Sequence, residues 1–223
     1  MGIGIYENDH TQGPACAIAA GAGSIYRNYF AIVNGRIGQT AENQIDCLAD
    51  LGAALGNDAG RLWKMRNGYA LATESGLAEI SQRLEASSDA QLEELRGRLR
   101  IGIQWNTQVT LAGCSHLVSQ AYCSALPVAY SRLAPSLWER FARLILEALY
   151  EATLYAGVLN AQASGVGTVY LTTVGGGAFG NPLEWILAAV ERALNLHRKT
   201  ALDVAIVSFR VPNPAIGRLI TKF

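Results

Sequence analysis

Several residue types and patterns that signal particular functions are scarce in this 223-residue chain. Its four cysteines include no CxxC pair and its three histidines are scattered, which argues against a structural zinc site and a disulfide framework. Lysine plus arginine and aspartate plus glutamate number 18 each, so no net field draws the chain to nucleic acid or an anionic membrane. We expect no metal, no cofactor, no nucleic-acid partner and no membrane partner.

Long apolar runs are also missing. No stretch approaches the roughly 20 uninterrupted apolar residues of a membrane span, and no basic segment followed by an apolar run opens the chain. These absences predict a cytoplasmic protein. Half of the residues are apolar and only 16% are charged, which is enough apolar material for one sizeable core. We therefore expect residues 1–223 to form a single domain.

The clearest structural pattern lies in the last third. A β-branched run at 168–174, a glycine loop at 175–180, a helix that starts at Asn181-Pro182 with Glu184, and a second apolar run at 202–209 follow one another. Such a strand–helix–strand crossover builds a parallel sheet with helices on both faces. The pattern predicts an α/β fold.

The first two thirds predict further alternation of helices and strands. A β-prone run ends at an Asn-Gly turn, amphipathic spacing and capping signals mark four helices, and two more runs resemble strands. The predicted elements are a β-prone run at 29–33, a turn at Asn34-Gly35, helices at 39–55, 77–84, 89–98 and from Ser136 with Glu139 to Asn160, and strands at 101–109 and 118–123.

The glycine loop is the first candidate site. A loop between a strand and a helix can hold a phosphate on successive backbone N–H groups, and glycine keeps side chains out of the way. Phe179 either stacks on a ligand or plugs the local core, and the loop as a whole has the alternative role of a flexible turn. The candidate ligand-binding residues are Gly175, Gly176, Gly177, Ala178, Phe179 and Gly180.

The same glycines satisfy GxGxxG, so a nicotinamide-dependent oxidoreductase is an alternative. That fingerprint belongs to the first strand–helix unit of a domain, with an acid about 20 positions on at the end of the second strand. Here only 43 residues follow Gly180, and Asp203 precedes its strand. The position of the motif therefore argues against a Rossmann site.

The second candidate site is a row of acids. Glu42, Asp46 and Asp50 are spaced i, i+4, i+8, so on a helix they share one face with no lysine or arginine on that helix to balance them. Like charges at this spacing destabilise a helix, so the row does not serve helix stability. Such carboxylates can orient sugar hydroxyls, activate water or stabilise a cationic leaving group, whereas the alternative is an exposed acidic face.

Several stretches together resemble a known superfamily. The run at 171–182 (LTTVGGGAFGNP) and the strand at 203–209 (DVAIVSF) resemble macrodomains and poly(ADP-ribose) glycohydrolase. The runs at 13–21 (GPACAIAAG), 26–29 (YRNY), 38–51 (GQTAENQIDCLADL) and 118–130 (VSQAYCSALPVAY) resemble its MavL-type branch of arginine-specific ADP-ribosylhydrolases. The resemblance implies a three-layer α/β/α fold with a mixed central sheet. It also leads us to expect that a further segment of relatives, preceding Tyr6, is missing here.

The resemblance also implies an activity and roles for residues. The implied activity is removal of mono-ADP-ribose from a modified protein, from arginine and with ubiquitin-like or other arginine-modified substrates as partners; the alternative is a reader that binds ADP-ribose without cleaving it. Diphosphate binding falls to the glycine loop. The implied catalytic residues are Asp46, Asp50 and Glu42, and the further ligand contacts are Asn28, Gln39 and Gln44.

Overall fold

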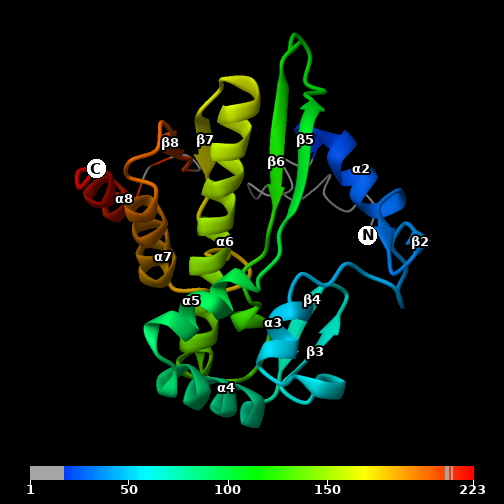
Figure 1. Cartoon of the computed structure of the whole chain (residues 1–223), viewed down its shortest axis with the longest axis vertical. Helices are drawn as coiled ribbons and strands as arrows, with labels where there is room; N and C mark the ends of the chain where they lie inside the picture. The colour runs from blue at the N-terminus through cyan, green and yellow to red at the C-terminus, as the bar shows by residue number, and fades with distance from the viewer. Residues whose placement is uncertain (1–17, 209–210, 212) are drawn as a thin grey trace. The chain divides into compact units, whose positions relative to one another are not determined.

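The computed structural model describes residues 18–208, 211 and 213–223. In that part of the chain, helices alternate with short two-stranded sheets, so the predicted mixed α/β class is confirmed (Figure 1). The chain divides into two compact units, Met1–Asp46 with Gly102–Tyr122 (unit 1) and Cys47–Ile101 with Cys123–Phe223 (unit 2). The single-domain organisation stays a prediction.

The part of unit 1 that the structure describes contains one helix and two antiparallel hairpins. The Asn34-Gly35 turn has positive φ angles of 49° and 77°, which is the backbone a tight two-residue hairpin needs, and it confirms the predicted turn. The two predicted strands around 101–123 also form, with a register shift between Gln104 and Thr107. The elements are α2 (Gly21–Tyr29), β1 (Ile32–Val33), β2 (Arg36–Ile37), β5 (Gly102–Gln108) and β6 (Leu117–Tyr122).

Unit 2 is mostly helical. Its helices α4, α5, α6 and α7 confirm the four helical segments expected at 77–84, 89–98, 136–160 and after Asn181. The elements are α3 (Ala49–Ala54), η2 (Asp58–Gly60), β3 (Trp63–Arg66), β4 (Tyr69–Ala72), α4 (Glu74–Ala86), α5 (Asp89–Gly97), η3 (Val128–Tyr130), α6 (Pro135–Ser164), β7 (Thr168–Leu171), α7 (Leu183–Leu196), β8 (Asp203–Ile206) and α8 (Pro214–Ile220).

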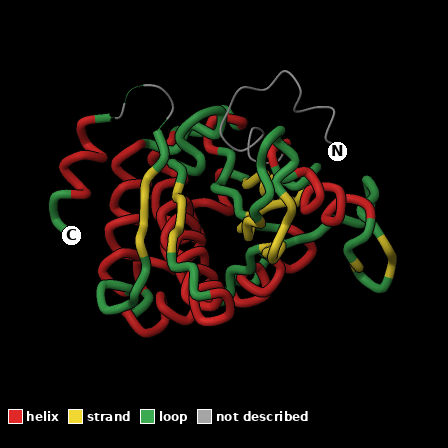
Figure 2. The backbone as a smooth tube through the Cα atoms, turned by 90° about the horizontal axis from the view of Figure 1, so that it is seen from above, coloured by secondary structure: helices red, strands yellow, loops and turns green. Residues whose placement is uncertain are grey.

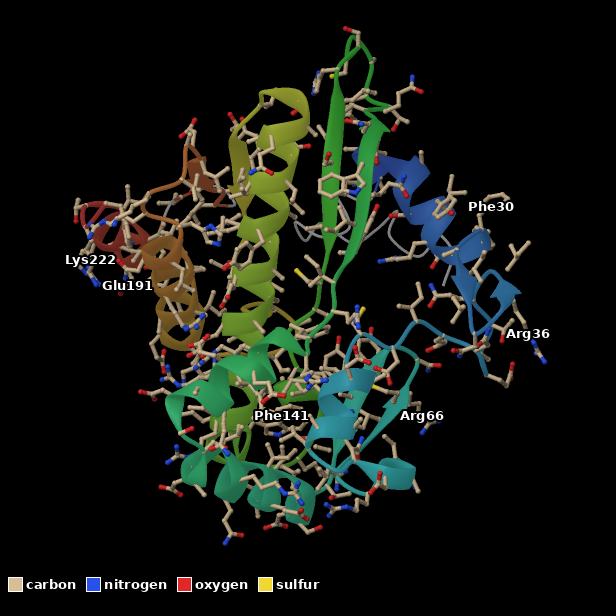
Figure 3. All side chains as sticks on the ribbon, viewed as in Figure 1. Phe30, Arg36, Arg66, Phe141, Glu191 and Lys222 are labelled. Atoms are coloured by element: carbon tan, nitrogen blue, oxygen red, sulfur yellow. The ribbon has the colours of Figure 1, made fainter. Side chains whose placement is uncertain are left out.

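The long helix α6 organises the core of unit 2. It packs against α4, α5, α7 and β7, and its inward face is fully buried over most of its length. Phe141 lies inside this core, with its ring centroid 5.1 Å from that of Trp63 (Figure 3). All described residues of the buried apolar cluster belong to unit 2, so burial of apolar surface within this unit favours its folding.

The crossover predicted in the last third is present. Strands β7 and β8 run parallel, in register from Thr168 opposite Asp203 to Leu171 opposite Ile206, and α7 connects them (Figure 2). The loop from the end of β7 to the start of α7 contains all the predicted glycine-loop residues. Within the described ranges, none of the helices has the length and apolar character needed to cross a bilayer.

The helix predicted over 39–55 is wrong for its first ten residues, because only Ala49–Ala54 is helical. Polar side chains before it bind the backbone in a non-helical path, which competes with helix formation. The Thr40 hydroxyl accepts from the amides of Glu42 and Asn43, at 3.3 and 3.1 Å, and Gln39 Oε1 accepts from the Ile45 amide at 3.0 Å.

Two other local predictions are wrong. The helix expected from a Ser136 and Glu139 capping box begins instead at Pro135, whose fixed φ suits a first helical position, and its N-cap Ala134 offers no side chain. The β-prone run at 29–33 is a strand only at Ile32–Val33, because Tyr29 ends α2.

Candidate functional site

The glycine loop of unit 2 has a defined backbone. Gly175 and Gly180 adopt positive φ angles of 84° and 69°, which disfavour any residue with a Cβ. The Gly180 amide donates to the Gly177 carbonyl at 3.0 Å, and the Asn181 amide donates to the Gly175 carbonyl at 2.9 Å. These bonds fold the segment into two successive turns, so it is not a loosely connected linker.

Three consecutive amides at the tip of this loop remain available. Among the described residues, the N–H groups of Gly177, Ala178 and Phe179 donate to no acceptor. Gly177 and Ala178 are exposed, and no atom lies within 4 Å of the position that a Cβ on Gly177 would take. Helix α7 starts three residues after Gly180 without a side-chain cap, so its first amides add partial positive charge. Successive free amides of this kind can bind an anion.

Phe179 packs within an aromatic cluster. Its ring makes edge-to-face contacts with Tyr130 and Tyr69, at centroid distances of 5.3 and 5.8 Å, and those two rings are 5.2 Å apart. Phe179 is also half-buried against the core of unit 2. Phe179 therefore packs in the local core, and the exposed half of Tyr130 leaves aromatic surface beside the loop.

Two buried side chains form hydrogen bonds with the backbone at the two ends of the loop. The hydroxyl of Tyr150 donates to the Thr172 carbonyl at 2.6 Å and accepts from the Val174 amide at 2.9 Å. The side-chain amide of Asn181 donates to the carbonyls of Leu126 and Gly175, at 2.9 and 3.2 Å. The side-chain oxygen of Asn181 is buried and has no partner among the described residues.

In unit 1, two of the predicted ligand contacts meet. Gln39 Nε2 donates to the Arg27 carbonyl at 3.1 Å and to Asn28 Oδ1 at 3.4 Å, and the Gln39 amide donates to the Asn28 carbonyl at 2.8 Å. Asn28 is buried, at 7% exposed, and Gln44 is half-buried. Asn28 and Gln39 thus form one polar cluster within unit 1.

The three candidate carboxylates do not share a helix face, which corrects the predicted row. Glu42 and Asp46 are exposed in the non-helical segment of unit 1, whereas Asp50 lies in α3 of unit 2. The charge of Asp50 is balanced by Arg100, whose Nε and Nη2 lie 2.7 and 2.6 Å from Asp50 Oδ2. Helical spacing compares residues on one helix only, so it cannot predict an ion pair with an arginine 50 residues away.

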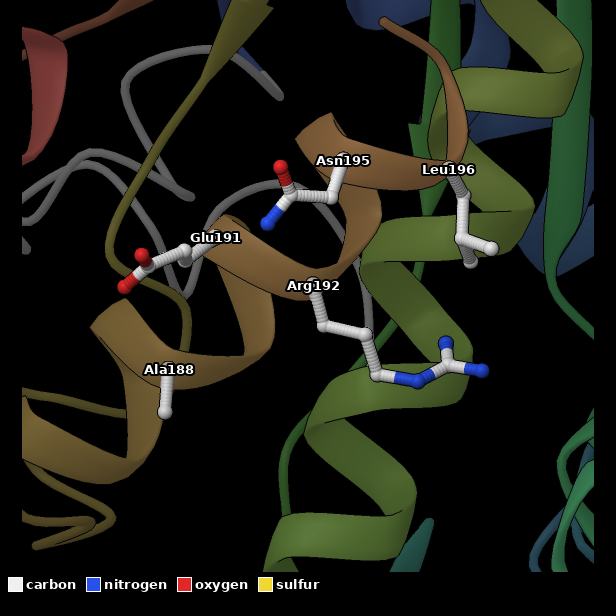
Figure 4. A pocket seen from close by; sticks show the side chains of 5 residues that line it. All are labelled: Ala188, Glu191, Arg192, Asn195 and Leu196. Atoms are coloured by element: carbon white, nitrogen blue, oxygen red, sulfur yellow. The ribbon is translucent and has the colours of Figure 1, made fainter. Parts of the chain in front are cut away.

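A surface hollow elsewhere in unit 2 carries no predicted residue. It lies along α7 and is lined by Ala188, Glu191, Arg192, Asn195 and Leu196 (Figure 4). The guanidinium of Arg192 is already paired with Glu151 of α6 and Glu93 of α5, at 2.5 and 2.6 Å. The charge of Arg192 is therefore already neutralised by carboxylates of α5 and α6.

Two groups at the loop were missed by the sequence analysis. Tyr150 lies in a long apolar helical run where a tyrosine looks like another core residue, and Tyr69 and Tyr130 are distant in sequence from the loop that they contact.

Among the described residues, no three metal-ligating side chains gather at one place. Comparison with protein-family models, curated proteins and solved structures finds no match for this chain.

Proposed function

We propose that this chain is a macrodomain-like ADP-ribosylhydrolase that removes mono-ADP-ribose from arginine of a modified protein. In this proposal the parallel pair β7 and β8 belongs to a mixed central sheet between two helical layers. The resemblance of the sequence at 171–182 and 38–51 motivates the proposal. The observation that carries it is the set of free amides at Gly177, Ala178 and Phe179.

The loop suits a diphosphate for three physical reasons. Its free amides and the uncapped start of α7 favour negative charge, and Gly177 leaves room for a ligand to approach the backbone. The aromatic surface of Tyr130, in η3, lies beside the loop and suits the flat faces of a nucleotide. A net charge of zero leaves such local groups as the means of holding an anion.

Hydrolysis is assigned to the carboxylates. Departure of an arginine from ADP-ribose leaves a guanidinium group, which a carboxylate binds in two-pronged geometry while a second carboxylate activates the attacking water. Glu42 and Asp46 are exposed, whereas Asp50 holds the guanidinium of Arg100. The pairing of Asp50 supports a second candidate function, a reader that binds ADP-ribose without cleaving it.

The two candidates separate in one experiment on the full chain. Release of free ADP-ribose from an arginine-modified protein is measured by chromatography, and ADP-ribose binding is measured by calorimetry. We expect Asp46→Ala and Asp50→Ala to abolish release and retain binding, whereas Asp58→Ala, which removes another exposed aspartate, retains both. Unchanged release in both variants would remove the catalytic assignment. Binding by the parent chain without turnover selects the reader, and absence of binding overturns both candidates.

A further inference from the structure

Tyr150 is the most deeply buried polar side chain at the glycine loop. Its side chain rises from α6 inside the core and is 1% exposed, yet its hydroxyl reaches the backbone where β7 passes into the loop. Burial raises the pKa of this phenol above its usual range, so the hydroxyl is neutral and can donate one hydrogen bond while accepting another.

The two bonds of that hydroxyl constrain the entrance to the loop. Thr172 O receives the phenolic hydrogen at 2.6 Å, and the Val174 amide points back at the phenolic oxygen at 2.9 Å. The Val174 amide also lies 2.9 Å from the Thr172 carbonyl, so the chain turns sharply at Thr173. One fixed hydroxyl therefore determines where the peptide groups on both sides of Thr173 point.

Asn181 constrains the exit in the same way. It is 3% exposed, and its side-chain amide joins the Gly175 carbonyl to the Leu126 carbonyl, which lies outside the loop. Neither Tyr150 nor Asn181 supplies a donor to the tip at 177–179. Both instead tie the ends of the loop to the rigid core, which keeps the free amides from collapsing onto other acceptors.

We propose that Tyr150 and Asn181 are positioning residues for phosphate binding: they hold the glycine loop ready for a ligand that neither of them touches. This inference rests on the proposed function, because it assigns the loop a phosphate. A merely structural role would instead lower the stability of the whole chain without a specific change at the loop.

The test compares Tyr150→Phe with Tyr155→Phe, the same substitution five residues later on α6. Tyr155 is 54% exposed and its hydroxyl makes no hydrogen bond to the described residues, so it is a matched control. Two measurements are made on the full chain: amide hydrogen exchange by NMR without ligand, and ADP-ribose affinity by calorimetry. Tyr150→Phe should speed exchange at the hydrogen-bonded loop amides of Val174, Gly176, Gly180 and Asn181 roughly tenfold relative to α4 amides and weaken ADP-ribose binding roughly tenfold. Tyr155→Phe should change neither.

The exchange measurement separates failure of this inference from failure of the proposed function. Unchanged loop exchange in Tyr150→Phe, or equal acceleration at all amides, overturns the positioning role whatever the ligand is. Faster loop exchange in a chain whose parent does not bind ADP-ribose supports the tether and overturns only the proposed ligand. If Tyr150→Phe does not fold, the same two measurements on Asn181→Ala decide the matter, with the same expected direction.

Discussion

Gly177 and Gly180 belong to one loop but differ in what a methyl group would meet. A Cβ on Gly180 would lie 2.7 Å from that of Ala129, at a φ of +69°, whereas a Cβ on Gly177 meets no atom within 4 Å. Gly180→Ala should therefore lower the free energy of unfolding by about 2 kcal/mol through backbone strain and overpacking. Gly177→Ala should change it by less than about 1 kcal/mol.

The same pair of variants separates stability from binding. The methyl group of Gly177→Ala would stand among the free amides and should weaken ADP-ribose binding roughly tenfold, because a side chain blocks the approach of a phosphate. Urea unfolding and calorimetry measure the two effects. Equal loss of stability in both variants would show that the loop backbone differs from that described.

Burial of His197 predicts a pH-dependent stability of the chain. The residue is 8% exposed, and its ring lies 4.6 Å from that of Tyr155. Burial lowers the pKa of His197, although Glu151 acts in the opposite direction. As the pH falls through the unfolded-state value of about 6.5, the unfolded chain takes up the proton first, so the free energy of unfolding falls. The loss levels off below the lowered pKa. Urea unfolding between pH 7.5 and 5 should show a smaller decline in His197→Gln, and an equal decline in both chains contradicts this role.

At the scale of elements, apolar periodicity predicts the secondary structure well where the packing of apolar side chains alone determines it. Helix α4 and the crossover through β7, α7 and β8 follow from spacing and β-branched runs, because their buried faces match these patterns. Prediction fails where polar side chains bind the backbone. Thr40 and Gln39 do so in the segment that spacing assigned to a helix, and this error also produced the acidic row.

One hairpin was missed although its signal was present. Asn67-Gly68 repeats the Asn-Gly signal recognised at Asn34-Gly35, and its φ angles of 51° and 79° close the β3–β4 hairpin. The glycine loop itself was predicted as a phosphate-binding loop, but its tether was not. The contact between Tyr150 and Thr172 joins residues 22 apart that belong to different elements, and single-sequence spacing carries no information on such tertiary pairs.

An ion-pair network joins α5, α6 and α7, and we expect it to contribute to the free energy of unfolding. Arg192, whose side chain is 21% exposed, bridges Glu93 and Glu151, whereas the pair of Arg98 with Glu94 is at least half exposed. Arg192→Ala should lower the free energy of unfolding by about 2 kcal/mol, because it leaves the half-buried Glu151 without its partner. Arg98→Ala should leave the free energy of unfolding nearly unchanged, because water screens an exposed pair. Urea unfolding measures both, and similar small losses would show that the network contributes no more than a surface pair.

At the scale of the whole molecule, the residues of the proposed site are divided between the two units. The glycine loop, its tether and the aromatic cluster all belong to unit 2, as does the buried apolar cluster. Glu42, Asp46, Asn28 and Gln39 all belong to unit 1. Removing unit 1 therefore removes two candidate carboxylates and the predicted contacts Asn28 and Gln39, but it keeps the glycine loop and Asp50.

A shortened chain tests this division directly. Gly102 pairs with Tyr122 across an antiparallel ladder, so the ends of the removed hairpin lie about 5 Å apart and two glycines can join residues 47–101 to 123–223. Because this chain keeps the core around Trp138, we expect cooperative urea unfolding by near-ultraviolet circular dichroism, with ADP-ribose affinity within roughly tenfold of the full chain.

The shortened chain should release no ADP-ribose, since it lacks Glu42 and Asp46. A folded shortened chain that has lost binding would show that Asn28 and Gln39 hold part of the ligand, because they are the predicted contacts removed with unit 1. Loss of the cooperative transition would show that the core of unit 2 depends on unit 1. Retained release would move the catalytic groups into unit 2, where Asp50 is the remaining candidate carboxylate.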